Sequence, residues 1–465
     1  MTSTITKYDT TTLAAQVAGP VLTPGAPGYD QEVAGFNVAH RPAPAVVIGA
    51  TSAADISAAV RWATKQGLQV RSQATGHGLT NDLNGTVLIS TRRLTQLDID
   101  PVAGTARIGA GVRWRAVIDA AAPHGLAPLN GSSSNVGVVG YTLGGGIGPM
   151  ARRYGFAADH VRALTVVTAD GEIRAADAEH HPDLFWALRG GKIGFGVVTE
   201  IEIELMPVSR FFGGGIFFPG TSATDVLQAW RSWAPTLPVE ASTSIALLRL
   251  PPDPQLPPPL QGQFVVHLRY THLGDADEAA ALLAPMRGTA PILIDTVAEL
   301  PYAAIDAVHM DPTSPMPCFD RGMALSEFPA EAVDRLVAAN GAESGSALTL
   351  TEVRLLGGAL SAPSLVPNAV SGRQAAFAVY VLGVPAGPAA AQMPGQVKTV
   401  IDALSAWRAG GLLNFLGHAE PSELTALWST ADRQRLAHIA QQYDPTDTFG
   451  AAAVFGPAAS PGVAN

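Results

Sequence analysis

The chain has 465 residues, of which 47% are hydrophobic and 15% charged, with a formal net charge of −10 and an isoelectric point near 5.5. No apolar run reaches the ~18 residues of a membrane span, and an acidic surface disfavours nucleic acid, whose binding depends on clustered Lys and Arg. This composition predicts a soluble globular protein of two or three domains, with neither nucleic acid nor a membrane as partner.

The cysteine content and the N-terminal residues predict the cellular compartment. Cys318 is the only cysteine, which excludes an intramolecular disulfide. Residues 1–20 contain neither a basic segment nor a continuous apolar stretch, so no signal peptide is expected. Both features predict a cytoplasmic protein.

The hydrophobic periodicity of the first 125 residues predicts strands and helices in mixed order rather than regular βαβ units. Ser52 and Gly67 suit the N-cap and the C-cap of the first helix. Short apolar runs predict strands at 45–48, 68–70, 86–90 and 105–109, and helical spacing predicts helices at 55–66 and 113–124.

Residues Val70–Gly78 (VRSQATGHG) come after the first helical pattern and end in a histidine between glycines. Small residues after a short strand let consecutive amides converge on an anion, and glycine permits positive φ and close approach of a ligand. We therefore predict a cofactor-binding loop, with His77 facing the cofactor. The expected contacts are Arg71, Ser72, Gln73, Ala74, Thr75, Gly76, His77 and Gly78.

The segment Gly131–Gly148 (GSSSNVGVVGYTLGGGIG) repeats this pattern about sixty residues later, and two such loops suit one pyrophosphate. A Rossmann domain is the weaker alternative, because its glycines directly follow a first strand and an acid comes about twenty residues later. The expected contacts are Ser132, Ser133, Gly137, Gly140, Tyr141, Gly144, Gly145, Gly146 and Gly148.

Other ligand motifs are missing from the sequence. The Gly190-Gly191-Lys192 stretch lacks the Ser or Thr and the upstream glycine of a P-loop, and neither His-Glu-x-x-His nor paired Cys-x-x-Cys occurs. We expect no metal and no nucleotide hydrolysis.

The composition changes near Pro207, where glycine and proline runs begin to punctuate the chain. Before this point, strands are predicted at 162–169 and 195–205. After it, strands are predicted at 244–250, 263–270, 347–356 and 376–381, which would pair as an antiparallel sheet backed by helices. No repeat of 20–50 residues is visible.

Taken together, the two loops resemble the vanillyl-alcohol oxidase and p-cresol methylhydroxylase superfamily of flavoproteins, most closely its berberine-bridge-enzyme-like branch. The resemblance continues in 183–191 (DLFWALRGG), 195–199 (FGVVT), 413–415 (LNF) and 443–446 (YDPT). It implies an α+β fold with a two-subdomain FAD-binding domain at 1–207 (core about 40–207), an antiparallel-sheet substrate domain at 208–408, and a return of 409–465 to the FAD domain.

The resemblance also implies how FAD is held. His77 matches a histidine that family members often bond to the 8-methyl carbon of the isoalloxazine ring; the alternative is a structural histidine beside non-covalent flavin. Ser133 stands where some members carry a second linking cysteine, so a single linkage is expected. Val197 and Val198 are carried over as adenine-side contacts, and Asn414 as a residue close to the flavin.

Two segments depart from the family pattern, namely Lys192-Ile193-Gly194 and Phe449–Phe455. The first lacks the usual glycine-asparagine pair, and the second lacks the Arg and Asn that usually follow the Asp-Pro element. We expect an atypical cofactor pocket there.

Glu352 is predicted as the catalytic base, because it lies in a strand followed by Gly-Gly, TLTEVRLLGG, that resembles the family's catalytic carboxylate strand. Strand periodicity puts Arg354 on the same face. The alternative is a solvent-exposed ion pair of little energetic value. His267 and Arg269 also share a face, and they and Tyr380 would either orient substrate or form the polar face of the sheet.

The resemblance implies an FAD-dependent oxidase. A base would take the proton of a hydroxyl or amine, hydride would pass from the adjacent carbon to the flavin, and O2 would reoxidise it to give H2O2. The substrate would be a small or medium organic molecule, such as a sugar or a natural-product intermediate. The alternatives are a flavin dehydrogenase, a redox-neutral cyclase or rearrangement catalyst, and a flavin-loaded binding protein without turnover.

Overall fold

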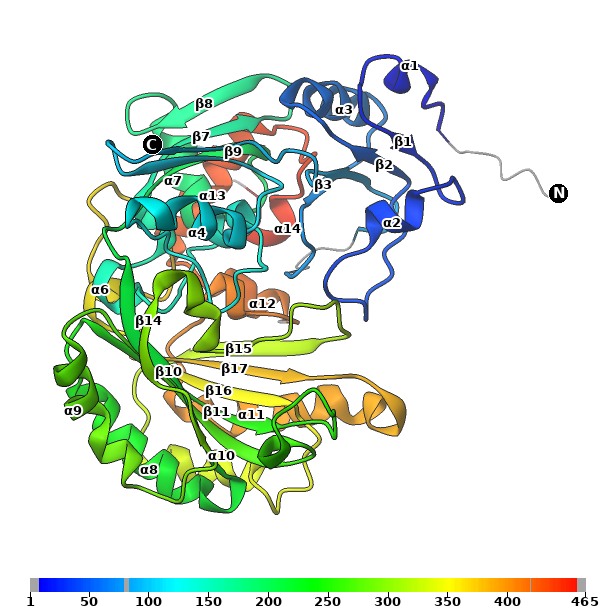
Figure 1. Ribbon diagram of the computed structural model, residues 1–465. Coiled ribbons are helices and arrows are strands. Elements are labelled where there is room, and N and C mark those ends of the chain that lie inside the picture. Colours follow the sequence, from blue (N-terminus) through cyan, green and yellow to red (C-terminus); the bar gives the residue numbers. More distant parts are fainter. Residues whose placement is uncertain (1–7, 79–82, 419, 458–465) are drawn as a thin grey trace, which may run out of the picture.

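The structure is a computed structural model that describes residues 8–78, 83–418 and 420–457. The described strands form three sheets arranged in two lobes (Figure 1). The first lobe holds a mixed sheet and a small antiparallel sheet, and the second lobe holds a large antiparallel sheet backed by helices. The predicted α+β fold class is confirmed. In the part of the chain described, no helix is long and apolar enough to cross a membrane.

The mixed sheet is built from the short apolar runs near the N-terminus. Its strands follow the order β1-β2-β4-β3, with β2, β4 and β3 parallel and β1 antiparallel to β2. All residues of β2 and β4 are buried, as is typical of parallel strands covered on both faces. The strands are β1 (Val21–Leu22), β2 (Val46–Gly49), β3 (Val70–Gln73) and β4 (Val87–Ser90).

The first predicted helix is α3 (Ala53–Lys65), which begins at its predicted cap. The Ser52 hydroxyl accepts a hydrogen bond from the Asp55 amide at 3.2 Å. At the other end the C-cap is Gln66, and the predicted cap Gly67 follows it with a φ of +67°. Glycine is favoured at this left-handed position after a helix because it has no Cβ.

The small antiparallel sheet has the order β5-β6-β9-β7-β8. Along β9 (Val197–Glu204), Ile201 and Ile203 are buried while the intervening glutamates are partly exposed, as their alternation predicts. The other strands are β5 (Leu97–Asp100), β6 (Thr105–Gly109), β7 (Val161–Val167) and β8 (Ile173–Asp177). The helices of this region are α1 (Thr11–Ala14), α2 (Tyr29–Val33), α4 (Trp114–Ala121), α5 (Val138–Leu143), α6 (Ala151–Tyr154) and α7 (Pro182–Gly191).

The large antiparallel sheet has the order β13-β10-β12-β11-β16-β17-β15, and β14 also pairs with β10. Its helices cover one face, away from the first lobe (Figure 1). The strands are β10 (Arg210–Pro219), β11 (Ala241–Arg249), β12 (Phe264–His272), β13 (Ile294–Asp295), β14 (Ala298–Pro301), β15 (Phe319–Leu325), β16 (Leu350–Leu355) and β17 (Phe377–Gly383). The helices are α8 (Ala223–Trp233), α9 (Ala276–Arg287), α10 (Ala330–Asn340) and α11 (Met393–Ala403).

β11, β12, β16 and β17 correspond to predicted strands, whereas β10 and β15 were not predicted. In β10 the reason is the run Gly213–Gly215, which was interpreted as a break between elements. These glycines instead allow close packing across the sheet, because a Cβ on Gly215 would collide with the His267 ring. Glycine inside a strand thus marks close approach of a neighbour here.

The two faces of the large sheet differ in polarity. On β16, Val353 and Leu355 point into a core that they share with Trp230 of α8. Glu352 and Arg354 lie on the opposite face, which turns toward the first lobe. The polar face therefore lies between the sheet and the first lobe.

The last part of the chain returns to the first lobe (Figure 1). Leu436 lies against Gly191 of α7, where a Cβ on the glycine would come within 2.8 Å of Leu436 Cδ2. The Phe455 ring packs on Phe195 at 5.6 Å between centroids. The helices of this part are α12 (Pro421–Thr425), α13 (Thr430–Tyr443) and α14 (Ala452–Phe455).

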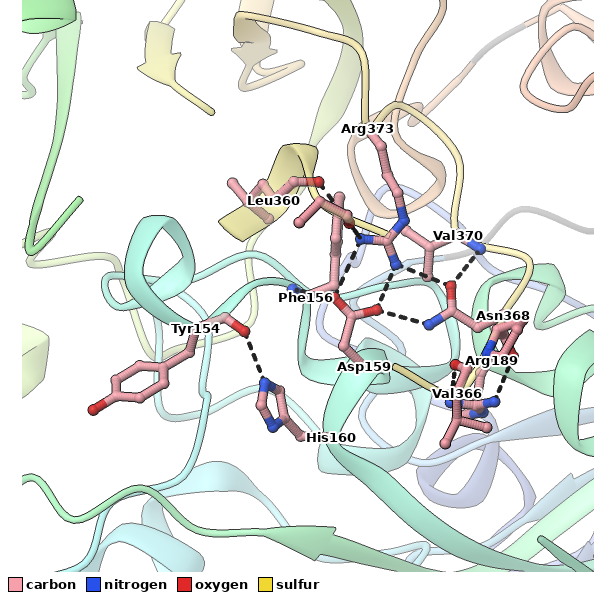
Figure 2. Close-up of polar contacts among 12 residues, drawn as sticks. Tyr154, Phe156, Asp159, His160, Arg189, Leu360, Val366, Asn368, Val370 and Arg373 are labelled. Atoms are coloured by element: carbon pink, nitrogen blue, oxygen red, sulfur yellow. Dashed lines mark hydrogen bonds and ion pairs between the residues drawn. The ribbon is translucent and has the colours of Figure 1, made fainter. Parts of the chain in front are cut away.

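Figure 2 shows a polar cluster that ties the segment 360–373, which precedes β17, to the first lobe. Asp159 accepts hydrogen bonds from Asn368 Nδ2 at 2.7 Å and from Arg373 at 2.5 Å. Arg189, which is fully buried, donates to the carbonyl oxygens of Val366 and Pro367 at 3.2 and 2.6 Å. The Arg-Gly-Gly end of the 183–191 motif thus fastens the two lobes together.

Candidate active site

The loop after β3 is held by its carbonyl groups. The carbonyl oxygens of residues 73–76 accept hydrogen bonds from Thr91, Arg92, Phe36 and Asn37. Within the described residues, no acceptor is bonded to the amides of Thr75, Gly76, His77 or Gly78. These donors are the kind that an anionic group of a cofactor would occupy.

The His77 ring is held in one orientation. It stacks on Phe36 with 4.0 Å between ring centroids, and its Nδ1 lies 2.8 Å from Thr75 Oγ1. Burial, with a smaller effect of the nearby Arg113 charge, lowers the pKa of His77 to about 4. The imidazole is therefore neutral near pH 7.

The two predicted loops lie side by side. Gly137, the N-cap of α5, is so close to the first loop that a Cβ on it would lie 3.5 Å from Thr75 Cγ2. Ser133 Oγ accepts a hydrogen bond from the Asn135 amide at 3.3 Å, and Ser132 hydrogen-bonds the Asp311 carboxyl. The structure thus brings together the two segments that the sequence predicted to share one ligand.

Several glycines of the second segment are explained by protein packing. A Cβ on Gly144 would collide with the Asn414 amide, one on Gly146 with the Tyr141 ring, and one on Gly148 with a backbone carbonyl. Gly145 has a φ of +103°. Gly140 and Gly78, in contrast, have nothing within 4 Å of a Cβ position, so these two glycines are the ones that leave open space beside the loops.

Asn414, on the returning chain, is fixed against the glycine-rich segment. Its Nδ2 donates to the Tyr141 carbonyl oxygen at 2.7 Å, and its Oδ1 accepts from Lys192 Nζ at 3.2 Å. Burial lowers the pKa of Lys192 to about 8. Lys192, which the sequence showed only as a departure from the family pattern, thus contacts a predicted cofactor residue.

Most of the other predicted cofactor residues lie further from the contact between the two loops. Arg71 donates to the carbonyl oxygen of Val70 and to Gln69, and it lies against Gly450 of the returning chain. Gln73 is buried and donates to the carbonyl oxygens of Val33 and Ala34. The remaining positions are Ser72, which is exposed, Ala74, which lies near Gly137, and Val197 and Val198, which are buried in β9.

Glu352 lies in a buried charge cluster on the polar face of the large sheet. Its carboxylate is 2.9 Å from Arg269 and 3.0 Å from Arg354, and His309 Nε2 lies 3.7 Å away. Only 4% of Glu352 is exposed, so the alternative of a solvent-exposed ion pair is wrong. Burial alone would raise the pKa of Glu352, but Arg354 and Arg269 together lower it well below its ordinary value.

The charge cluster touches the glycine-rich segment directly. Arg354 donates to the Ile147 carbonyl oxygen at 3.4 Å, and Thr271 donates to that of Pro149 at 3.0 Å. A cavity lined by Ile147, Ser244, Arg269, His309 and Arg354 lies at this junction. The polar face and the second loop thus form one region.

His267 belongs to the sheet rather than to this junction. Its ring stacks on Phe217 at 4.0 Å between centroids, and its Nδ1 accepts a hydrogen bond from Arg269 at 3.2 Å. Burial holds the pKa of His267 well below its usual value. Its neutral ring positions Arg269.

Tyr380 stands beside Glu352 on the neighbouring strand β17. Its hydroxyl donates to Asp320 Oδ2 at 2.9 Å, and its ring meets Phe415 edge-on at 5.7 Å. Phe415 and Asn414 line a second cavity with Gly144 and Gly146. Tyr380 therefore lies beside the cavity of the glycine-rich segment.

Sequence reasoning missed His309, Asp311, Asp320 and His418. None stands in a motif, and each acquires its position only because β15, the segment before it and the returning chain meet the polar face. No group of three or more potential metal ligands gathers in the ranges that the structure describes.

These features fit FAD. The amides of the first loop suit an anionic pyrophosphate, the open sides of Gly78 and Gly140 leave room beside it, and the neutral His77 ring belongs to the same loop. Tyr141 Oη is buried without a described partner. The backbone amides of residues 75–78 would hold the pyrophosphate, and the side chains of His77, Tyr141 and Asn414 would lie on the side of the flavin ring.

A family model described as "FAD binding domain" matches residues 44–177, which contain β2 to β8 and both loops. The chain therefore contains an FAD-binding domain of this family, on the fold of the berberine-bridge-enzyme-like oxidases. The resemblance predicted from the sequence is confirmed.

Among curated proteins, the (R)-6-hydroxynicotine oxidase of Paenarthrobacter nicotinovorans is 30% identical over 311 residues, which are 66% of this chain and 65% of that protein. An uncharacterized FAD-linked oxidoreductase of Bacillus subtilis, YvdP, is 30% identical over 48% of this chain and 51% of that protein. The chain thus spans between about half and just under two thirds of the length of these relatives.

Solved structures match over almost the whole chain. The 6-hydroxy-D-nicotine oxidase of Arthrobacter nicotinovorans has a TM-score of 0.79 at 25% identity, covering 93% of this chain and 96% of that one. The xylooligosaccharide oxidase of Myceliophthora thermophila has a TM-score of 0.83 at 19% identity, covering 96% and 99%. A berberine-bridge-enzyme-like protein of Physcomitrella patens has a TM-score of 0.82 at 19% identity, covering 95% and 98%.

Proposed function

We propose that the protein is an FAD-dependent oxidase. It would take hydride from a carbon next to a hydroxyl or amine of a small or medium organic substrate, and pass the electrons to O2 to give H2O2. The observation that carries this proposal is the junction of the polar face with the glycine-rich segment, where Arg354 donates to the Ile147 carbonyl oxygen. Substrate bound on the polar face would lie against the cofactor loops.

FAD, when bound, supplies the hydride acceptor, because ordinary side chains have no hydride chemistry. This chain's residues would hold the cofactor, orient the substrate and move its proton. The charge cluster adds an electrostatic contribution. Arg269 and Arg354 share the Glu352 carboxylate, and both also act on the nearby Asp311 carboxyl. The two guanidinium groups would stabilise negative charge that develops on the substrate oxygen.

We assign the proton-accepting role to Tyr380 together with Asp320. Glu352 was the predicted base, but two guanidinium groups lower the pKa of its carboxylate and make it a weak proton acceptor. Burial and the Asp320 charge raise the pKa of Tyr380 well above its usual value, so its phenol is neutral. Tyr380 would accept the substrate proton while its own proton moves to Asp320 Oδ2, 2.9 Å away.

The relatives support this substrate class without fixing the substrate. One is named for 6-hydroxynicotine, an amine, and others are named for chitooligosaccharide and xylooligosaccharide, which carry hydroxyl groups. The single Cys318 supports the further proposal of a cytoplasmic enzyme. We also propose the division into an FAD domain at 1–207, a substrate domain at 208–408 and a return at 409–465.

Two measurements test the function. Purified protein should be yellow, and screening alcohols, sugars and amines for peroxide release should find a substrate that bleaches the flavin. Flavin bleaching without oxygen consumption would identify a dehydrogenase, and product without peroxide or net oxidation would identify a redox-neutral catalyst. Binding without bleaching would identify a non-catalytic flavin protein, and colourless protein after FAD is supplied would refute the proposal.

We also propose a single covalent link through His77. Its support is the neutral, stacked imidazole beside the amides of the first loop. After acid precipitation the yellow colour should stay with the wild-type protein and move into the supernatant for His77→Ala. Colour released from the wild type would mean a non-covalent flavin, which leaves the oxidase proposal intact.

A further inference from the structure

A line of polar side chains leads from Tyr380 to the protein surface, and the four residues come from four separate segments. Tyr380 (β17) donates to Asp320 Oδ2 (β15) at 2.9 Å. Asp320 Oδ1 lies 3.2 Å from Nδ1 of His418, on the returning chain. His418 Nε2 lies 2.9 Å from Nε2 of His40, which precedes β2 and is exposed.

The histidines are held in place by their surroundings. The His418 ring stacks on Phe319 at 4.4 Å between centroids, and its centroid lies 5.0 Å from that of the His40 ring. Its backbone amide donates to the Asp320 carbonyl oxygen at 2.8 Å, and a Cβ on the preceding Gly417 would collide with that carbonyl. The returning chain is therefore pressed onto β15, which fixes His418 beside Asp320.

We propose that Tyr380, Asp320, His418 and His40 form a proton path that carries the substrate proton from the polar face to solvent. The inference rests on the proposed function, because only proton removal from substrate at Tyr380 gives the path its use. The neutral phenol of Tyr380 makes an exit necessary, since Tyr380 accepts a proton only by passing its own to Asp320.

Each transfer takes one proton from the substrate and releases one proton to water. The substrate proton bonds to Tyr380 Oη as the phenol proton moves to Asp320, and the Asp320 carboxyl passes a proton to His418 Nδ1. His418, whose resting proton is on Nε2, gives that proton to His40 Nε2, and His40 releases its Nδ1 proton to water. The carboxylate is then restored and both rings are neutral, each with its proton on the other nitrogen, so both rings must return to their starting tautomers before the next proton passes.

The charges around the path decide where a proton rests. The hydrogen bond that the protonated His418 ring donates to Asp320 raises the pKa of His418, whereas burial and the neighbouring His418 lower the pKa of His40. The other titratable or charged groups acting on the path are Asp311 and Cys318, near Tyr380, and Arg321, near His418. A proton is thus held at His418, so its transfer to His40 is the uphill step of the path, and its release from His40 to water is favourable.

The test measures the rate of flavin reduction by stopped-flow absorbance in the FAD-loaded variants His418→Gln and His40→Gln, with a substrate from the peroxide screen. His438→Gln, an exposed histidine of α13, is the matched control. His418→Gln should slow reduction at saturating substrate about tenfold or more, with KM and flavin spectrum unchanged. Added imidazole should restore part of the rate, most readily for His40→Gln, whose site faces solvent.

The solvent isotope effect and the pH profile separate this role from a structural one. Reduction by His418→Gln should show a larger isotope effect in D2O and a pH profile without the limb attributable to His418. A variant that matches His438→Gln in rate constant, isotope effect and pH profile would overturn the path.

A readout without substrate keeps this inference separate from the oxidase proposal. In nitrogen-15 spectra of the FAD-loaded protein, His40→Gln should shift the titration of His418, because the two rings share a proton. Independent titration of the two rings would overturn the path even in an active oxidase. If no substrate bleaches the wild type, the oxidase proposal fails while this measurement still decides whether the path exists.

Discussion

The Glu352 carboxylate illustrates how neighbouring charges decide the chemistry of a single side chain. Its burial and its contacts with Arg269 and Arg354 act on its pKa in opposite directions, and the two guanidinium groups prevail. An ionised carboxylate between two arginines is a structural anchor for both. The same carboxylate without them, in an equally buried place, would be the stronger base.

Glu352→Gln should destabilise the fold because it leaves two buried guanidinium groups without their counter-charge. Breaking a buried ion pair from one side costs about 3–5 kcal/mol, which urea unfolding would detect as a lowered midpoint. Glu299→Gln is the matched control, since its pair with Arg210 is more than half exposed and should contribute about 0–1 kcal/mol. Equal stability of the two variants would show that the cluster is not held by Glu352.

Lys192 gives a prediction for the pH dependence of stability. Burial lowers its pKa from 10.5 to about 8, so between these values the unfolded chain holds a proton that the folded chain has lost. The contribution of Lys192 to the free energy of unfolding therefore rises with pH between about 8 and 10.5, and it is lowest below pH 8. Lys192→Met should be more stable than wild type near neutral pH, with an advantage that shrinks toward pH 10.5.

Urea unfolding at several pH values measures this difference. Lys65→Met, at an exposed position at the end of α3, is the control and should show no such trend. A stability difference between Lys192→Met and wild type that stays constant with pH would contradict the lowered pKa.

Strand β10 shows that an element can depend on glycines that its sequence presents as a break. Gly213–Gly215 lie opposite β12, and the His267 ring fills the space where a Cβ of Gly215 would be. His267 is 1% exposed and in turn contacts Arg269. The glycine run thus supports the polar face indirectly, by leaving room for a residue that positions an arginine.

Gly215→Ala should lower stability by about 1–3 kcal/mol, the usual cost of overpacking a core. The control, Gly395→Ala in α11, adds a methyl group where nothing lies within 4 Å. It should stabilise by roughly 0.5–1 kcal/mol, because alanine is the better helix former. Thermal melting of both variants measures the effects, and a stabilised Gly215→Ala would refute the packing argument.

The whole molecule is two lobes whose relative position creates the candidate site. The cluster of Asp159, Asn368, Arg373 and Arg189 fastens the segment before β17 onto the first lobe (Figure 2). Burial lowers the pKa of Arg189 to about 10, but its guanidinium stays charged near neutral pH and donates to backbone carbonyls. The fastening thus keeps the polar face beside the cofactor loops.

Asp159→Asn should loosen this junction, because it removes the charge that pairs with Arg373. Hydrogen exchange should become faster in residues 361–373, where Leu365 is already fully exposed, while β16 stays protected. Asp119→Asn, in a surface pair with Arg115, is the control and should leave exchange unchanged. Unchanged exchange in Asp159→Asn would show that other contacts hold the lobes.

The sequence by itself determined the α+β class, the N-cap of α3 and the pairing of the two loops. These follow from local periodicity, N-cap chemistry and clustered small residues, which neighbouring residues alone decide. The same patterns carried the family resemblance that the FAD-binding-domain match confirmed. Strand β10 was not predicted, because the role of its glycines depends on His267, far along the chain.

Only the tertiary structure decided the charge state of Glu352 and the surroundings of Tyr380. Arg269 is 83 residues from Glu352 in the chain (352 minus 269), and Asp320 is 60 residues from Tyr380. Electrostatic fields and hydrogen bonds act through space over a few ångströms, whereas sequence patterns report only neighbours along the chain. The residues that set the chemistry of this site are therefore visible only after the sheet has paired and the lobes have met.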